Sequence, residues 1–220
     1  MIIALNFNAP ELAEELVNQL PEAWIVQIGE GKTVQNQLYR IKENKYWVGN
    51  WVDVFNVLWR TFCKPGKEQN MPQYPYIWMV NDDITGATMR MYHDLIEIAE
   101  DHDAFMVTPA FNSPHSVFHP VVGNDIREVN WVDMCCPLIN FEKYLALGGF
   151  DPAFKGYGAD IDLSVRAREK GLKMIVSDQH EIYHIGGYTV KKNNTWEQSN
   201  VDEMNKVLMA KYGKVWHELV

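Results

Sequence analysis

The sequence has few cysteines, no long apolar run and no excess of positive charge. Its three cysteines, Cys63, Cys135 and Cys136, are too few and odd in number, which excludes a disulfide framework. No apolar run approaches the roughly 18 to 20 residues needed to span a bilayer. The first residues lack the basic region that begins a signal peptide. We therefore expect a cytoplasmic protein without a transmembrane segment.

Acidic residues outnumber basic ones, 29 against 20, and the formal net charge is −9. Nucleic-acid backbones and anionic membranes both require a basic face, so this balance argues against a general affinity for either. Hydrophobic residues make up 47% of the chain, which is enough for a packed globular core. Because no internal repeat and no clear linker occurs, we expect residues 1–220 to form a single domain.

Apolar runs alternate with helical patterns along the chain, and residues 109–130 form a polar loop between them. The strands expected on this pattern are residues 1–7, 24–28, 76–80, 104–108, 132–136 and 173–177. The expected helices are residues 51–62, 89–100, 141–147, 162–170 and 201–212, together with one that starts near Asn8 and ends at Pro21. This alternation predicts an α/β fold with a mainly parallel central sheet flanked by helices, in which ligands bind beyond the carboxyl ends of the strands.

Two carboxylates and an amide, Asn81-Asp82-Asp83, directly follow the apolar strand expected at 76–80. Asn and Asp favour turns, so a solvated turn is one interpretation. The other is a divalent-cation site, because Mg²⁺ and Mn²⁺ prefer oxygen ligands and often combine one or two carboxylates with substrate phosphates. The triplet alone leaves both interpretations open.

A second acidic cluster lies about 75 residues further on, in the run GGFDPAFKGYGADIDLSVRAREKG. Asp160 and Asp162 stand at the expected start of a helix, where either can cap it, and Asp162 can pair with Arg166 four residues later. The helix dipole also stabilises a carboxylate at this position in its charged form, which suits it to accept a proton. Structural and catalytic roles are both compatible with this pattern.

These two clusters, followed by His184-Ile185-Gly186-Gly187, resemble the family 2 glycosyltransferases of GT-A fold. The resemblance covers residues 1–187 and is strongest from 148 to 187. It implies a GT-A-like single domain with a nucleotide-sugar-binding half at 1–110 and an acceptor and catalytic half at 111–190. Residues 191–220 would then form a C-terminal helical tail.

The resemblance also implies roles for single residues. Asp83, the last carboxylate of a DxD-like motif, and His184 would hold Mn²⁺ or Mg²⁺ on the nucleotide diphosphate. Asp82 would lie near the ribose or the donor sugar, and Asp160 would be the catalytic base. The remaining positions that would line the nucleotide pocket are Asn6, Asn8, Glu30, Asp53 and Asn56.

We therefore expect a metal-dependent, inverting glycosyltransferase that moves a sugar from a nucleotide-diphosphate donor, a UDP-sugar, to an acceptor hydroxyl. Trp131, Tyr157 and Tyr183 are candidates for stacking on sugar or base faces. The acceptor is a carbohydrate or another hydroxyl compound. A modified base in DNA is an alternative that would need a stacking pocket. It would also need a basic patch formed by Lys155, Arg166, Arg168, Lys191 and Lys192.

Two departures from the family pattern favour a different class of function. Asn81 stands where the family usually has the first Asp, and Ala159 stands where Glu is common. Both fit a catalytically inactive nucleotide- or sugar-binding module of the same fold. A nucleotidyltransferase is less well supported, because no glycine-rich basic loop occurs near residue 8.

Overall fold

The computed structural model of the chain describes residues 1–7, 10–28, 35–41, 51–55, 75–112, 119–155, 157–185 and 197–220. Within these ranges, nine strands form a sheet in the order β3-β2-β1-β4-β8-β6-β9-β5, and β7 also pairs with β9. The strands are β1 (Ile2–Phe7), β2 (Ala23–Ile28), β3 (Gln37–Ile41), β4 (Tyr76–Asn81), β5 (Ile84–Thr85), β6 (Ala104–Phe111), β7 (Ile126–Glu128), β8 (Leu138–Asn140) and β9 (Lys173–His184). The helices are α1 (Pro10–Gln19), α3 (Met89–Asp101), α4 (Phe141–Ala146), α5 (Ala159–Glu169), α7 (Glu197–Tyr212) and the 3₁₀ helix η1 (Trp216–Glu218). Residues 51–55 are also helical.

The long ladders of this sheet are parallel. β1 pairs in parallel with β2 and β4, β2 pairs with β3, and β6 pairs with β9. The antiparallel ladders are short and involve β8 between β4 and β6, and β5 and β7 against β9. The predicted α/β fold with a mainly parallel sheet flanked by helices is confirmed.

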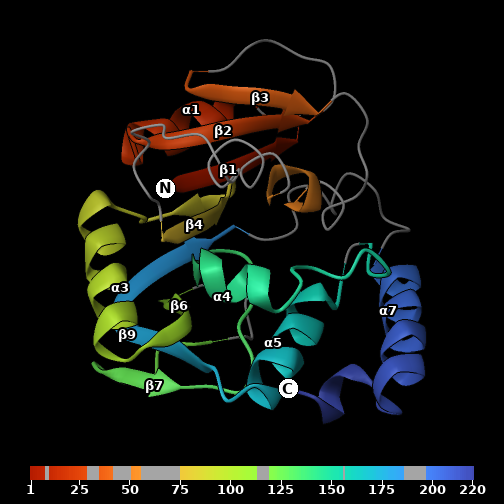
Figure 1. Cartoon of the computed structure of the whole chain (residues 1–220). Helices are drawn as coiled ribbons and strands as arrows, with labels where there is room; N and C mark the ends of the chain where they lie inside the picture. Colours follow the sequence, from red (N-terminus) through yellow and green to blue (C-terminus); the bar gives the residue numbers. More distant parts are fainter. Residues whose placement is uncertain are drawn as a thin grey trace, which may run out of the picture.

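Helices cover both faces of the sheet. Successive side chains of a strand point to opposite faces, so one strand contributes residues to a core on each side. Ile2 and Ala4 of β1 pack in one core with α1 and α3. Ile3, between them, packs in a second core with residues 51–55, α4, α5 and α7. Figure 1 shows α3 on one side of the sheet and α5 next to α7 on the other. Among the described residues, no helix is long and apolar enough to cross a bilayer.

Residues 132–136 do not form the expected strand, and the strand in this region is β8. The side chain of Asp133 accepts a hydrogen bond from the backbone N–H of Cys135 over 2.8 Å, a local turn that competes with ladder formation. The carbonyls of Cys135 and Pro137 accept hydrogen bonds from Asn81 and Met79 of β4 instead. Because β8 runs against its neighbours, the residues before it lie at the edge where β4 ends.

Several other boundaries differ from the sequence prediction: β9 continues past Ser177 to His184, and α7 begins at Glu197 rather than at Val201. β6 continues to Phe111, and β7 lies within the expected loop at 109–130. α5 begins at Ala159 rather than at Asp162, after Gly158 in the left-handed conformation with φ of 90°. This start places both Asp160 and Asp162 in the first turn of α5.

Candidate active site

The acidic turn after β4 lies beside the carboxyl end of β9. Asp82 and Asp83 follow β4 directly, and β5 then pairs with β9 so that Ile84 lies opposite His184. The backbone N–H of Ile185 donates to the carbonyl of Asp83 over 3.0 Å. The pairing of β5 with β9 therefore brings two segments together that are far apart in the sequence.

Asp83 and His184 form a close pair. Oδ1 of Asp83 lies 3.1 Å from Nε2 of His184, and both side chains are mostly buried. Burial lowers the pKa of His184, but the hydrogen bond and charge of Asp83 outweigh it, and the charges of Asp133 and Asp82 act in the same direction. The pKa of His184 is consequently raised above its ordinary value.

Residues 131–135, here called the bridging segment, run from this pair to Asp160. At one end, Sγ of Cys135 lies 3.6 Å from Nδ1 of His184. At the other end, Nε1–H of Trp131 donates to Oδ2 of Asp160 over 3.2 Å. Burial and the nearby charge of Asp133 raise the pKa of the Cys135 thiol, so this sulfur stays protonated and is a poor nucleophile. The segment thus contacts both predicted functional clusters.

Asp133 stands in the middle of the bridging segment. Its backbone N–H donates to Nε2 of His119 over 3.0 Å. Its negative charge raises the pKa values of both Asp160 and His184. A third carboxylate is therefore close enough to act electrostatically on both ends of the site.

Asp160 lies in the first turn of α5 and has a strongly shifted pKa. Burial and the charge of Asp133 raise its pKa to about 7, although hydrogen bonds from the backbone and from Trp131 act in the opposite direction. A carboxyl group with a pKa near neutrality can both hold and release a proton under physiological conditions.

His119 supports the bridging segment as a buried, neutral ring. It lies 5.0 Å from the ring of Trp131 and 6.1 Å from that of Phe111, measured between centroids. Burial lowers its pKa to about 4. Because Nε2 accepts the hydrogen bond from Asp133, the imidazole proton lies on Nδ1.

The other predicted site residues are spread over the first half of the chain. Asn6 lies near the carboxyl end of β1, where its neighbour Leu5 is in register with Asn81 of β4. Asp53 is partly exposed on the helical residues 51–55, whose Phe55 packs against α4. Three of the predicted residues lie outside the described ranges: Asn8, Glu30 and Asn56.

The Asp83–His184 pair offers an oxygen and a nitrogen donor, which are ligand types that Mn²⁺ accepts. In the described part of the chain, no three His, Cys, Asp or Glu side chains converge closely enough to hold a metal ion by themselves. The pair therefore fits a metal ion only if a bound phosphate group or water supplies the remaining ligands.

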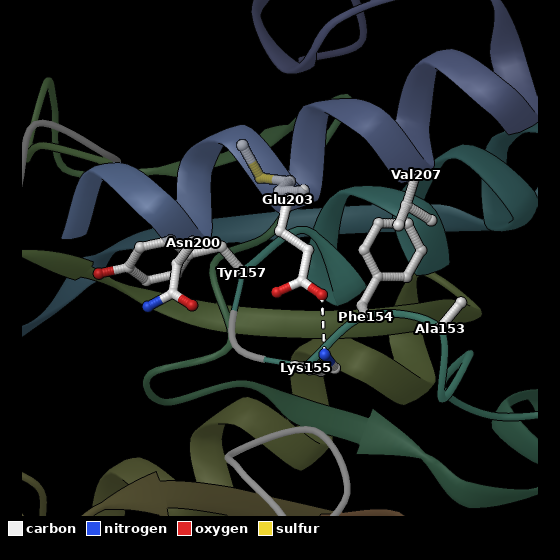
Figure 2. Close-up of a pocket in the computed structure, with 8 residues that line it drawn as sticks. Ala153, Phe154, Lys155, Tyr157, Asn200, Glu203 and Val207 are labelled. Carbon is white, nitrogen blue, oxygen red and sulfur yellow. Dashed lines mark hydrogen bonds and ion pairs between the residues drawn. The ribbon is translucent and has the colours of Figure 1, made fainter. Parts of the chain in front are cut away.

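A small hollow lies between the loop before α5 and the helix α7 (Figure 2). It is lined by Phe154, Tyr157 and Met204 among others, and Lys155 pairs with Glu203 across it over 2.8 Å. Its volume of about 10 Å³ is about the space that a single water molecule needs. The hollow is therefore too small for a sugar, although Tyr157 was a predicted stacking residue.

The described members of the predicted basic patch are engaged elsewhere. Lys155 pairs with Glu203, and Arg166 pairs with the buried Asp162, as predicted for that helix. Arg168 donates to two backbone carbonyls. Lys191 and Lys192 lie outside the described residues. These contacts give a DNA acceptor no support.

Sequence reasoning missed Asp133 and His119. An acidic residue inside the apolar run Trp131-Val132-Asp133-Met134-Cys135 was a signal that could have identified Asp133. His119 had no comparable signal, because it reaches the site only through contacts with residues distant in sequence.

A solved structure and a short sequence match bear on the fold of this chain. No protein-family model matches the chain. A stretch of 78 residues, 34% of the chain, is 27% identical to the O-antigen biosynthesis protein RfbC of Myxococcus xanthus and spans 6% of that protein. The structure resembles that of GalNAc-T7 crystallised with UDP, GalNAc and Mn²⁺, with a TM-score of 0.59 and 10% identity, over 83% of this chain and 43% of GalNAc-T7. The chain has a GT-A glycosyltransferase-like fold.

Proposed function

We propose that the protein is a metal-dependent, inverting glycosyltransferase that moves a sugar from a UDP-sugar to an acceptor hydroxyl. The observation that carries the proposal is the bridging segment, which contacts Asp160 through Trp131 and His184 through Cys135. The groups that we assign to cation binding and to proton acceptance are therefore both in contact with side chains of one short segment, which supports the proposal. The names of the similar proteins, one involved in O-antigen biosynthesis and one crystallised with UDP and Mn²⁺, support the same class.

Asp83 and His184 are the residues that would hold Mn²⁺ or Mg²⁺. When bound, the metal supplies positive charge to the leaving diphosphate. Asp82 would contact the ribose or the donor sugar. The nucleotide would occupy the half formed by residues 1–110, with these further contacts: Asn6, Asn8, Glu30, Asp53 and Asn56.

Asp160 takes the proton from the acceptor hydroxyl while the hydroxyl oxygen attacks the anomeric carbon of the donor sugar. The attack comes from the face opposite the diphosphate, so the bond to UDP breaks and the configuration inverts. A pKa of about 7 suits this role, because general bases are most effective when their pKa is near the working pH. The acceptor, a carbohydrate or another hydroxyl compound, would bind to the half formed by residues 111–190.

Release of UDP tests the proposal. The protein is incubated with Mn²⁺ and, in turn, UDP-glucose, UDP-galactose, UDP-GlcNAc and UDP-GalNAc, with a panel of sugar acceptors, and UDP is quantified. We expect Asp160→Asn to lower kcat by about 10²- to 10⁴-fold, the usual contribution of a general base. Asp83→Asn should abolish the release of UDP that Mn²⁺ stimulates in the wild type. Asp101 is an exposed residue at the end of α3, and Asp101→Asn should behave as the wild type.

Full turnover in both Asp83→Asn and Asp160→Asn would show that the residue roles are wrong. Binding of UDP with Mn²⁺ but no release of UDP from any donor would instead identify a catalytically inactive binding module. The departures at Asn81 and Ala159 make this second result the relevant alternative.

A further inference from the structure

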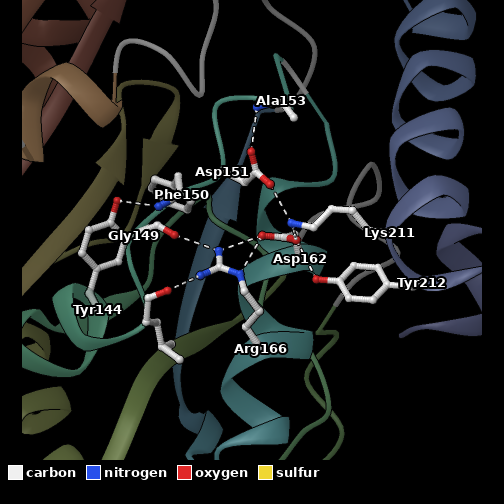
Figure 3. A network of polar contacts seen from close by, with 10 residues as sticks. Tyr144, Gly149, Phe150, Asp151, Ala153, Asp162, Arg166, Lys211 and Tyr212 are labelled. Carbon is white, nitrogen blue, oxygen red and sulfur yellow. Dashed lines mark hydrogen bonds and ion pairs between the residues drawn. The ribbon is translucent and has the colours of Figure 1, made fainter.

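A buried polar network joins α5 to the C-terminal helix α7 (Figure 3). Asp162 is fully buried, and each of its carboxylate oxygens accepts hydrogen bonds from charged or polar donors. Oδ2 lies 2.9 Å from Nε of Arg166 and 2.7 Å from its Nη2. Oδ1 lies 2.5 Å from Nζ of Lys211 and 2.6 Å from the hydroxyl of Tyr212. Two of these donors come from the last turn of α7.

The network is neutral overall and extends beyond Asp162. Nζ of Lys211 also lies 2.6 Å from Oδ2 of Asp151, so two carboxylates are matched by two cations. Arg166 donates further hydrogen bonds to the carbonyls of Leu147 and Gly149, each over 2.8 Å. A buried carboxylate with this many charge-assisted hydrogen bonds is held in one position.

The C-terminal segment, residues 197–220, contacts the start and the end of α5 as well. At the start, Gly158 packs so tightly on α7 that a Cβ added there would lie 2.5 Å from Cγ of Met204. Near the end, Arg168 donates to the carbonyl of Leu219 over 2.8 Å. The same guanidinium also donates to the carbonyl of Asn130, the residue before Trp131.

We propose that the C-terminal segment is a positioning element for Asp160, with Tyr212 and Lys211 as its positioning residues. Asp162 shares the first turn of α5 with Asp160, so holding the one fixes the backbone that carries the other. The inference rests on the proposed function only in treating Asp160 as the base. It gives the last 24 residues a role in catalysis without any contact with substrate.

Misplacement of a reacting group by about 1 Å can cost about 10²-fold in rate. The effect of loosening the network should therefore appear in kcat, because donor binding relies on other residues. It should also appear in the titration of Asp160, because a shifted first turn admits water and changes its distance from Asp133. A contact that served only folding would alter neither.

The test compares Tyr212→Phe with Glu203→Gln. Tyr212→Phe keeps the ring and removes only the hydroxyl that donates to Asp162. Glu203 lies on the same helix as Tyr212, and Glu203→Gln breaks its exposed ion pair with Lys155 of the loop before α5. The titration of Asp160 is followed by carboxyl ¹³C NMR, with its signal assigned by Asp160→Asn. For Tyr212→Phe we expect a fall in kcat of about tenfold, a KM for the donor within about twofold, and a pKa of Asp160 below the wild-type value.

Glu203→Gln should leave kcat and the titration unchanged, and Lys211→Arg should retain more activity than Lys211→Met. If Tyr212→Phe lowers the melting temperature but changes neither kcat nor the titration, the network is only structural and the inference is overturned. If Tyr212→Phe does not fold, the comparison of Lys211→Arg with Lys211→Met decides in its place. If the wild-type protein releases no UDP, the proposed function fails, while the NMR titration still tests this inference.

Discussion

Trp131 and Asp133 have opposite effects on Asp160. The negative charge of Asp133 raises the pKa of Asp160, whereas the indole N–H of Trp131 stabilises the charged form and lowers it. The balance of these two effects sets the pKa of Asp160, and hence the pH above which it can act as a base. Only the deprotonated carboxylate accepts the proton of the acceptor hydroxyl. We therefore expect kcat/KM to rise with pH through about 7 and then level off.

Substitution of Trp131 by Phe tests this balance. Trp131→Phe removes the hydrogen bond to the charged carboxylate, so the pKa of Asp160 should rise and the midpoint of the pH–rate profile should move to higher pH. At pH 7 the variant should be slower than the wild type, and above pH 9 the two rates should converge. Trp24→Phe is the matched control, since Trp24 lies on β2, is 43% exposed and is far in the sheet order from β9. A midpoint that moves to lower pH, or does not move, would contradict the proposed interaction.

The sequence indicates some of these residues and not others. Asp83 and Asp160 could be predicted as candidates, because each stands at the end of an element within a run of characteristic residues. Asp133 could not be placed with them, because its proximity depends on a turn that replaces an expected strand. The local sequence pattern identifies residues at the ends of helices and strands, but only the tertiary structure shows which of these ends lie close together.

At the start of α5, the backbone conformation and the close packing of α7 both favour glycine. At Gly158, φ is 90°, and an added Cβ would lie 2.5 Å from Cγ of Met204 and 3.0 Å from Cδ1 of Phe154. We expect Gly158→Ala to lower the free energy of unfolding by about 2–4 kcal/mol, the sum of backbone strain and overpacking. The measurement is urea denaturation followed by circular dichroism.

Gly171→Ala separates the two contributions. Gly171 also has positive φ, 68°, but an added Cβ there would meet nothing within 4 Å. Its replacement should cost only the backbone part, about 1 kcal/mol. Equal losses at the two positions would mean that the close approach of Met204 contributes nothing.

The elements themselves were predictable to different degrees. α3 and β4 are close to the predicted residues, because their apolar patterns are long and regular. β3, β5, β7 and β8 were missed, since all are short and three of them pair antiparallel with strands distant in sequence. α5 was predicted to begin three residues late, because a glycine cap in the left-handed conformation carries no side-chain signal.

The molecule as a whole should be stabilised by its donor nucleotide. Ligand that binds only the folded state at about 100 times its Kd adds about 2.7 kcal/mol, or about 5–10 °C in Tm for a chain of this length. We expect UDP with Mn²⁺ to raise Tm more than UDP or Mn²⁺ alone, and more than GDP or TDP with Mn²⁺. Thermal melts followed by fluorescence measure these differences.

Asp83→Asn controls for the metal in the same melts. It should lose the additional stabilisation that Mn²⁺ gives in the presence of UDP, because it removes one of the two proposed ligands. A larger effect of GDP than of UDP would show that the proposed donor class is wrong. An undiminished effect of Mn²⁺ in Asp83→Asn would place the cation elsewhere.

The antiparallel strand β8 affects where related sequences can vary without disrupting the sheet. A strand that runs opposite to its neighbours begins at the edge where they end, so the chain arriving at β8 lies beside the end of β4, which Asp82 and Asp83 follow. Insertions or deletions just before Trp131 would change the shape of this edge while leaving the parallel ladders and the bridging segment in place. New acceptor preferences could thus arise from changes in the length of one short loop.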